Sequence, residues 1–165
     1  MKPIDLTIVN AHSAYMVWLS NRGRYMFETD YDIVYAVSFE FDDSLFHQAY
    51  WLNLTNVSHS KSPNDTKIPQ TLICIVEEFF RQNPDILLYL CSTDNEQQAS
   101  RSRLFLRWFN GYEQQKKYAI LTSEVRGEGQ KEYVSMIVPR SHPQLEDIIQ
   151  AFNDEIALFN DNKPL

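Results

Sequence analysis

The residues best suited to chemistry are three arginines set among aromatic side chains, Arg101, Arg103 and Arg107. They follow an apolar run, residues 86–91, which reads as a buried strand and is followed closely by Asp94. An arginine keeps its charge in a protein and binds carboxylate or phosphate through two parallel hydrogen bonds. The cluster therefore predicts a contact with an anionic group, although it identifies no reaction.

The spacing of the arginines divides them between two sides of a predicted helix. Each residue advances a helix by about 100°, so Arg101 falls on the apolar side together with Asp94. Arg103 and Arg107 fall on the opposite side, four residues apart. We expect Arg101 to be at least partly buried and Arg103 and Arg107 to face solvent.

A buried arginine needs a carboxylate, backbone carbonyls or an anionic ligand. For Arg101 we prefer an ion pair that joins helix to sheet. The alternatives are a site in which Arg101 and Asp94 hold a small anion, and exposure at a frayed helix start. The binding hypothesis requires a concave pocket that also includes strand residues such as Tyr35 or Trp51.

Other motifs with chemical meaning are absent from the sequence. It has no glycine-rich dinucleotide or phosphate loop. Its four histidines are scattered, and its cysteines, Cys74 and Cys91, lack the spacing of a zinc site. We therefore predict no catalytic residue, no metal site and no cofactor, and we lean against an enzyme.

The composition limits the classes of protein to which the chain can belong. A chain of 165 residues with 44% hydrophobic content suits a single domain, with a core at residues 22–159 and a frayed tail at 160–165. Residues 1–21 have a mixed pattern that fits an extra strand, a short helix or an arm on a partner. The net charge of −7 argues against general nucleic-acid binding. Without a secretory signal or a membrane-length apolar run, we expect a soluble, cytoplasmic protein.

Hydrophobic periodicity predicts an α+β fold. Strand-like segments are found at residues 25–27, 31–41, 46–54, 86–91, 118–125 and 132–138. Helix-like segments are found at residues 66–82, 94–109 and 142–159. We expect a mainly antiparallel sheet of about five to seven strands with three helices packed on one face.

Several short stretches within residues 22–152 resemble an uncharacterised bacterial domain-of-unknown-function family. They are residues 25–30, residues 75–80, Asp94 with residues 101–109, and His142-Pro143. The resemblance implies no activity, so no catalytic residue can be transferred.

We favour a non-enzymatic protein-interaction module, which binds an unknown protein partner or forms a homodimer through Arg103 and Arg107. Arginine and aromatic residues are enriched where interfaces are energetically important. One alternative is a binder of a small anion or nucleotide, with or without enzymatic activity, that uses Arg101 and Asp94. Another is a nucleic-acid-associated regulator, which the acidic charge disfavours.

The double substitution Arg103→Glu with Arg107→Glu tests the favoured hypothesis. We expect folding to be unchanged because both side chains should lie in solvent. Binding to the partner should weaken because two contact charges are reversed. Pull-down from the source cell compares the partners of the two proteins, and an unchanged set would count against the hypothesis.

Overall fold

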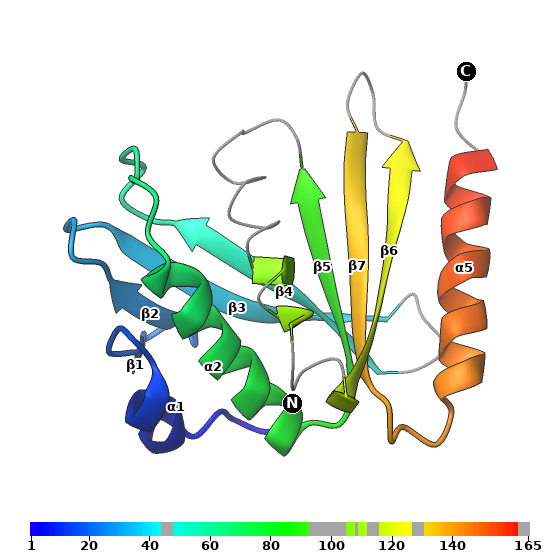
Figure 1. The fold of residues 1–165 in the computed structure, drawn as a ribbon, viewed down its shortest axis with the longest axis horizontal. Coiled ribbons are helices and arrows are strands. Elements are labelled where there is room, and N and C mark those ends of the chain that lie inside the picture. Colours follow the sequence, from blue (N-terminus) through cyan, green and yellow to red (C-terminus); the bar gives the residue numbers. More distant parts are fainter. Residues whose placement is uncertain (44–47, 93–104, 108, 112–115, 127–130, 162–165) are drawn as a thin grey trace.

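A computed structural model describes residues 1–43, 48–92, 105–107, 109–111, 116–126 and 131–161. These residues form one seven-stranded sheet with helices on both of its faces (Figure 1). The strands are β1 (Trp18–Leu19), β2 (Tyr25–Glu28), β3 (Val34–Asp42), β4 (Ala49–Asn56), β5 (Ile86–Ser92), β6 (Tyr118–Arg126) and β7 (Lys131–Pro139). The long helices are α2 (Lys67–Gln82) and α5 (Leu145–Asp161), and α1 (Leu6–His12) is shorter.

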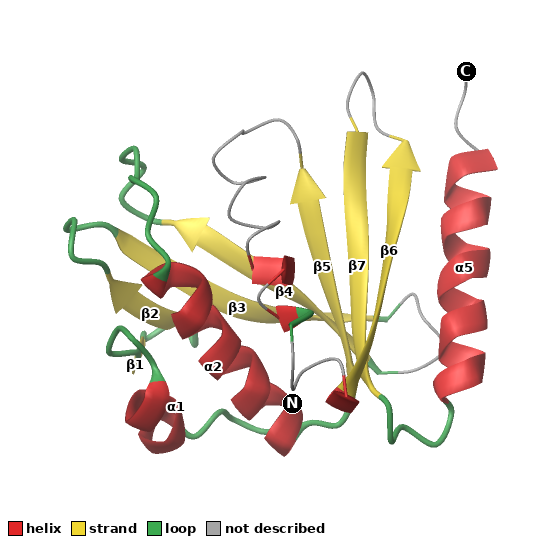
Figure 2. Cartoon of the chain, in the orientation of Figure 1, coloured by secondary structure: helices red, strands yellow, loops and turns green. Residues whose placement is uncertain are grey.

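The strand order is β1-β2-β3-β4-β5-β7-β6, and the pairing of β4 with β5 is parallel. All the other neighbouring strands are antiparallel. The chain reaches β5 through α2, as a parallel connection requires (Figure 2). The predicted α+β class and the mainly antiparallel sheet are therefore confirmed.

The two faces of the sheet carry different helices. Side chains alternate between the faces along each strand. Leu87 of β5 joins the buried cluster that contains α1 and α2, whereas Leu88 joins the cluster that contains α5. We name these the α2 face and the α5 face. Figure 1 shows α5 beside β6, away from α1 and α2.

The prediction that all three helices pack on one face was therefore wrong for the last of them. The reason lies in β5, whose run of apolar residues leaves neither face polar. Both faces of such a strand must be covered. The chain places α2 on one side before β5 and α5 on the other side after β7.

The apolar stripe of α2 forms the centre of the core on its face. Leu72, Ile75, Val76 and Phe79 are all buried, as helical spacing predicts. The ring of Phe79 stacks on Phe39 of β3 with a centroid distance of 4.7 Å. Aromatic contacts between helix and sheet thus fix α2 across the strands.

The N-terminal segment packs on α2 through polar contacts. The side chain of Asn83 accepts a hydrogen bond from the Lys2 backbone N–H at 2.7 Å and donates one to the Lys2 carbonyl at 3.0 Å. Glu78 accepts from the backbone N–H of Asp5 at 3.3 Å. The sequence left a strand, a short helix and an arm on a partner as alternatives for residues 1–21. The segment contains both a short helix and a two-residue strand, and it lies against its own chain.

Glu78 is a buried charge that is held by several donors. Its side chain is 2% exposed and lies 2.7 Å from Arg81 Nη2. The hydrogen bonds from Arg81, together with the backbone N–H of Asp5, hold the pKa of the Glu78 carboxyl below its usual range, against the effect of burial. The lowered pKa means that the ionised carboxylate stabilises the fold more than the protonated acid does.

The substitution Glu78→Gln should produce a pH-dependent loss of stability. Stabilisation by a carboxylate with a lowered pKa is fully present above its unfolded pKa and is lost as the pH falls through the folded pKa. The free energy of unfolding of the variant should be lower by about 1–3 kcal/mol at neutral pH. In urea titrations this difference should shrink as the pH falls below the ordinary glutamate pKa of 4.5. The exposed substitution Glu146→Gln is the control, and a difference that stays constant with pH would contradict the assignment.

Helix α5 buries only part of its apolar stripe. Ile148 and Phe152 are buried against the sheet, whereas Phe159 near the end of the helix is 46% exposed. The helix packs on β6 and β7, and Asn160 donates a hydrogen bond to the Glu124 carbonyl of the edge strand β6 at 3.2 Å. The sheet beyond β7 is thus left less covered on this face.

Two phenylalanines of α5 should differ sharply in their contribution to stability. Phe152→Ala should lower the free energy of unfolding by about 3–5 kcal/mol because it leaves a cavity in the core. Phe159→Ala removes the same atoms from an exposed position and should cost less than about 1 kcal/mol. Chemical denaturation measures both, and equal losses would contradict the packing of α5.

Candidate functional site

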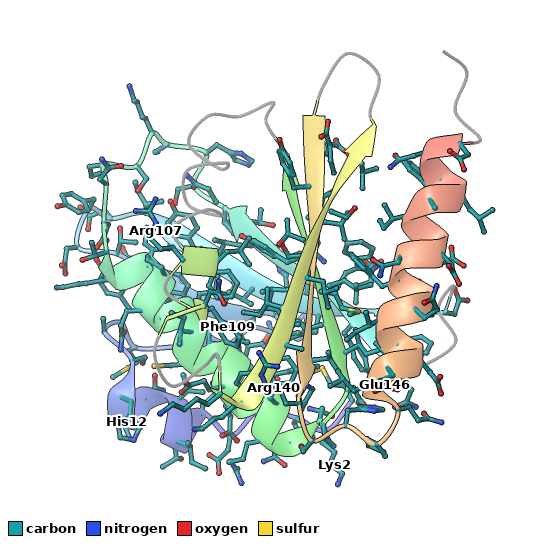
Figure 3. All side chains as sticks on the ribbon, turned by 45° about the vertical axis from the view of Figure 1, so that its right-hand side comes forward. Lys2, His12, Arg107, Phe109, Arg140 and Glu146 are labelled. Carbon is teal, nitrogen blue, oxygen red and sulfur yellow. The ribbon has the colours of Figure 1, made fainter. Side chains whose placement is uncertain are left out.

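Of the four residues that the sequence singled out, the structure describes only Arg107. Asp94, Arg101 and Arg103 lie outside the described residues, so their roles stay predictions. Arg107 is exposed on the helical turn formed by residues 105–107 (Figure 3). Whether it contacts a partner remains a prediction as well.

The turn that carries Arg107 is anchored by aromatic side chains on the α2 face. Phe105 packs edge-on against Tyr89 of β5 at 5.3 Å, and Phe109 lies 5.2 Å from the ring of Tyr118. Both phenylalanines are buried. Arg107 is therefore presented to solvent from a turn whose apolar side chains are fixed on the sheet.

The two strand residues that were named as alternatives for lining a pocket around Arg101 and Asp94 lie on opposite faces. Tyr35 is fully buried on the α2 face, where its ring stacks on Phe27 at 5.5 Å. Trp51 lies on the α5 face, where its partner across β3 and β4 is Glu40. Because the two residues point in opposite directions from neighbouring strands, they cannot share one pocket.

A groove of about 270 Å³ lies on the α5 face between the sheet and α5. Its lining is mainly apolar, with three carboxylates. The lining residues are Asp42, Trp51, Leu88, Leu90, Val125, Glu132, Val134, Phe152, Glu155, Ile156 and Phe159. We refer to it as the α5 groove.

The α5 groove has a buried floor and an exposed apolar mouth. Leu88, Val134 and Phe152 form the floor and are almost completely buried. Leu90 and Phe159 are 42% and 46% exposed. Leu90 is unusual because it belongs to β5, a strand with a neighbour on each side, and yet leaves its side chain open to water. The groove thus offers apolar surface that the fold itself does not cover.

The charges around the α5 groove are negative. Asp42, Glu132 and Glu155 line it, and neither of the two glutamates forms an ion pair within the described part of the chain. Helix α5 contains five acidic residues and no lysine or arginine. Unneutralised carboxylates beside an apolar surface favour a ligand that is both apolar and cationic.

The polar chemistry of the groove comes from its carboxylates alone. No described group of three histidine, cysteine or acidic residues could hold a metal ion. Cys74 packs with the cluster on the α2 face, away from the groove, and burial raises the pKa of its thiol to about 11. No helix in the described ranges is long and apolar enough to cross a membrane. The arrangement is suited to binding.

Sequence reasoning did not identify the α5 groove. Leu90 and Phe159 fit regular strand or helix patterns and were therefore interpreted as core residues, and Trp51 was named only for a different pocket, around Arg101 and Asp94. One available signal was the complete absence of basic residues from α5. The convergence of the three apolar side chains depends on which face α5 covers, and periodicity within one element does not determine that.

The model of a family described as a family of unknown function (DUF6169) matches residues 64–154, more than half of the chain. The resemblance to a domain-of-unknown-function family is therefore confirmed. The match includes Leu88, Leu90 and Glu132 of the α5 groove, whereas Trp51 and Phe159 lie outside it. No curated protein and no solved structure matches the chain.

Proposed function

Because the chain belongs to this family of unknown function, which supplies no activity, we propose a function from its own surface. The protein is a non-enzymatic interaction module that holds apolar side chains of a partner protein in the α5 groove. The observation that carries the proposal is the exposure of Leu90 and Phe159 beside a buried apolar floor.

The apolar mouth of the groove supplies the driving force for binding. Each Å² of apolar surface removed from water contributes about 25 cal/mol. An exposed apolar surface with a polar rim is typical of protein-interaction sites. Covering Leu90 and Phe159 with apolar side chains of a partner removes such surface, and the half-buried Trp51 adds an aromatic contact.

The size of the groove favours side chains over a small molecule. Pockets for cofactors and drug-sized ligands usually hold about 300–1,000 Å³ and enclose most of the ligand. The α5 groove, at about 270 Å³, lies just below this range, and its mouth is formed by exposed side chains. It suits a few side chains that project from a partner which remains largely outside.

The exposed turn at Arg107 supports a second contact surface. Arg107 projects from the α2 face, whereas the groove lies on the α5 face. The two surfaces therefore address separate partners or separate parts of one partner. The contact role of Arg103 and Arg107 remains part of the proposal.

The test uses peptides selected against the whole protein from a displayed random library, with affinities measured by calorimetry. The substitution Leu90→Asn replaces an apolar side chain by a polar one of similar size and should weaken the selected peptides by about tenfold or more. The matched control is Leu19→Asn, because Leu19 is also exposed but lies on β1 at the far edge of the sheet.

Thermal unfolding of both variants shows that the fold is retained. Selected peptides whose affinity falls only in the Leu90→Asn variant support the proposal. Failure to select any peptide, or equal losses in both variants, would overturn the assignment of function to the α5 groove.

A further inference from the structure

We propose that the α5 groove binds a basic amphipathic helix of a partner protein. This inference rests on the function proposed above and specifies its partner. Three properties of the α5 face carry it: the pairing of its strands, the room beside α5 and the sign of its charges.

The strand pairing excludes an added strand and favours a helix as the bound segment. The strands under the groove, β4, β5 and β7, each have a hydrogen-bonded neighbour on both sides. Their backbone groups are therefore unable to pair with an added strand. A segment laid on this face loses water from its own N–H and C=O groups, and an unpaired buried group is costly. A helix satisfies these groups internally.

The uncovered part of the sheet beside α5 is wide enough for one further helix. Neighbouring strands are about 4.8 Å apart and packed helices about 8–10 Å apart, so each helix covers roughly two strands. Helix α5 packs on β6 and β7. A second helix beside it lies over β5 and β4, where Leu90 is exposed and Trp51 is half-buried. Its apolar side would contact Leu90, Trp51 and Phe159 together.

The charges of the α5 face select a basic partner. The described strand positions on this face include no lysine or arginine, and they carry the acidic residues Glu28, Glu40, Asp42 and Glu132. Glu155 extends the negative charge onto α5. Lysine and arginine at the flanks of a bound helix would lie beside these carboxylates, whereas glutamate there would be repelled.

The same charges argue against a second copy of α5 as the occupant. In a symmetric dimer the partner's α5 would bring its own acidic residues, including Glu155, next to the carboxylates of the groove. A helix from a different protein avoids this repulsion if its flanks are basic. Apolar residues at positions i, i+3 or i+4, and i+7 would then contact the apolar surface of the groove.

The experiment compares designed peptides of about 18 residues, long enough for five helical turns. One peptide has leucines on one side and lysines on the other, the second replaces its lysines with glutamates, and the third scrambles the order of the first. Fluorescence anisotropy measures binding to the whole protein. We expect the basic helix to bind, and the acidic and scrambled peptides to bind at least about tenfold more weakly.

Two pairs of substitutions locate the charge effect. Glu132→Gln with Glu155→Gln removes two carboxylates from the groove and should weaken the basic helix severalfold and reduce its salt dependence. Glu146→Gln with Asp147→Asn removes the same charge from the start of α5, away from the groove lining, and should have a smaller effect. Equal effects of the two pairs would overturn charge recognition at the groove.

The outcomes separate this inference from the proposed function. If the basic and acidic helices bind equally well, and both bind more weakly to the Leu90→Asn variant, the inference of a basic partner is wrong. The groove would still be an interaction site. If library peptides bind at Leu90 but none of the designed helices binds, the inference of a helical partner is wrong and the proposed function stands. If native mass spectrometry shows a dimer of the protein that is lost in the Leu90→Asn variant, the groove binds a second copy of this chain. That result would overturn the inference.

Discussion

The fold depends on β5 having apolar side chains on both of its faces. Leu87 and Tyr89 require cover on one face, and Ile86 and Leu88 require cover on the other. A sheet that contains such a strand at its centre is stable only between two layers. The chain supplies a thick layer of α1, α2 and the aromatic turn near Phe105 on one side, and α5 on the other.

The unequal thickness of these two layers explains where binding surface is available. On the α2 face, stacked aromatic rings and the anchored N-terminal segment complete the cover. On the α5 face α5 is the one helix, among the residues that the structure describes, that covers the strands at one end of the sheet, and Leu90 is exposed. The polar side chains that line the groove on this thinner side are all carboxylates. The proposed α5 groove therefore lies on the face with the thinner layer.

Much of the fold could be predicted because its elements have strong internal periodicity. The stripe on α2 follows directly from the burial of one side of that helix. The side on which α5 lies could not be predicted, because an amphipathic helix fits either face of a doubly apolar strand. The anchoring of the N-terminal segment was also hidden, since Asn83 and Glu78 bind backbone groups and such bonds leave no pattern in the sequence. For the candidate site, the outward position of Arg107 followed from helical spacing. The groove, in contrast, arises from side chains of five strands and α5 that meet only in three dimensions.

The parallel junction between β4 and β5 joins the segment that the family model matches to the strands that precede it. The family match begins at residue 64, after β4, so the matched segment holds β5, β6 and β7 and lacks the strands that precede them. Removed from β4, the strand β5 would become an edge with unpaired backbone groups and apolar side chains on both sides, which favours aggregation. In this chain β4, which precedes the matched segment, shields that border of β5, so the matched segment depends on a strand outside it to complete the sheet.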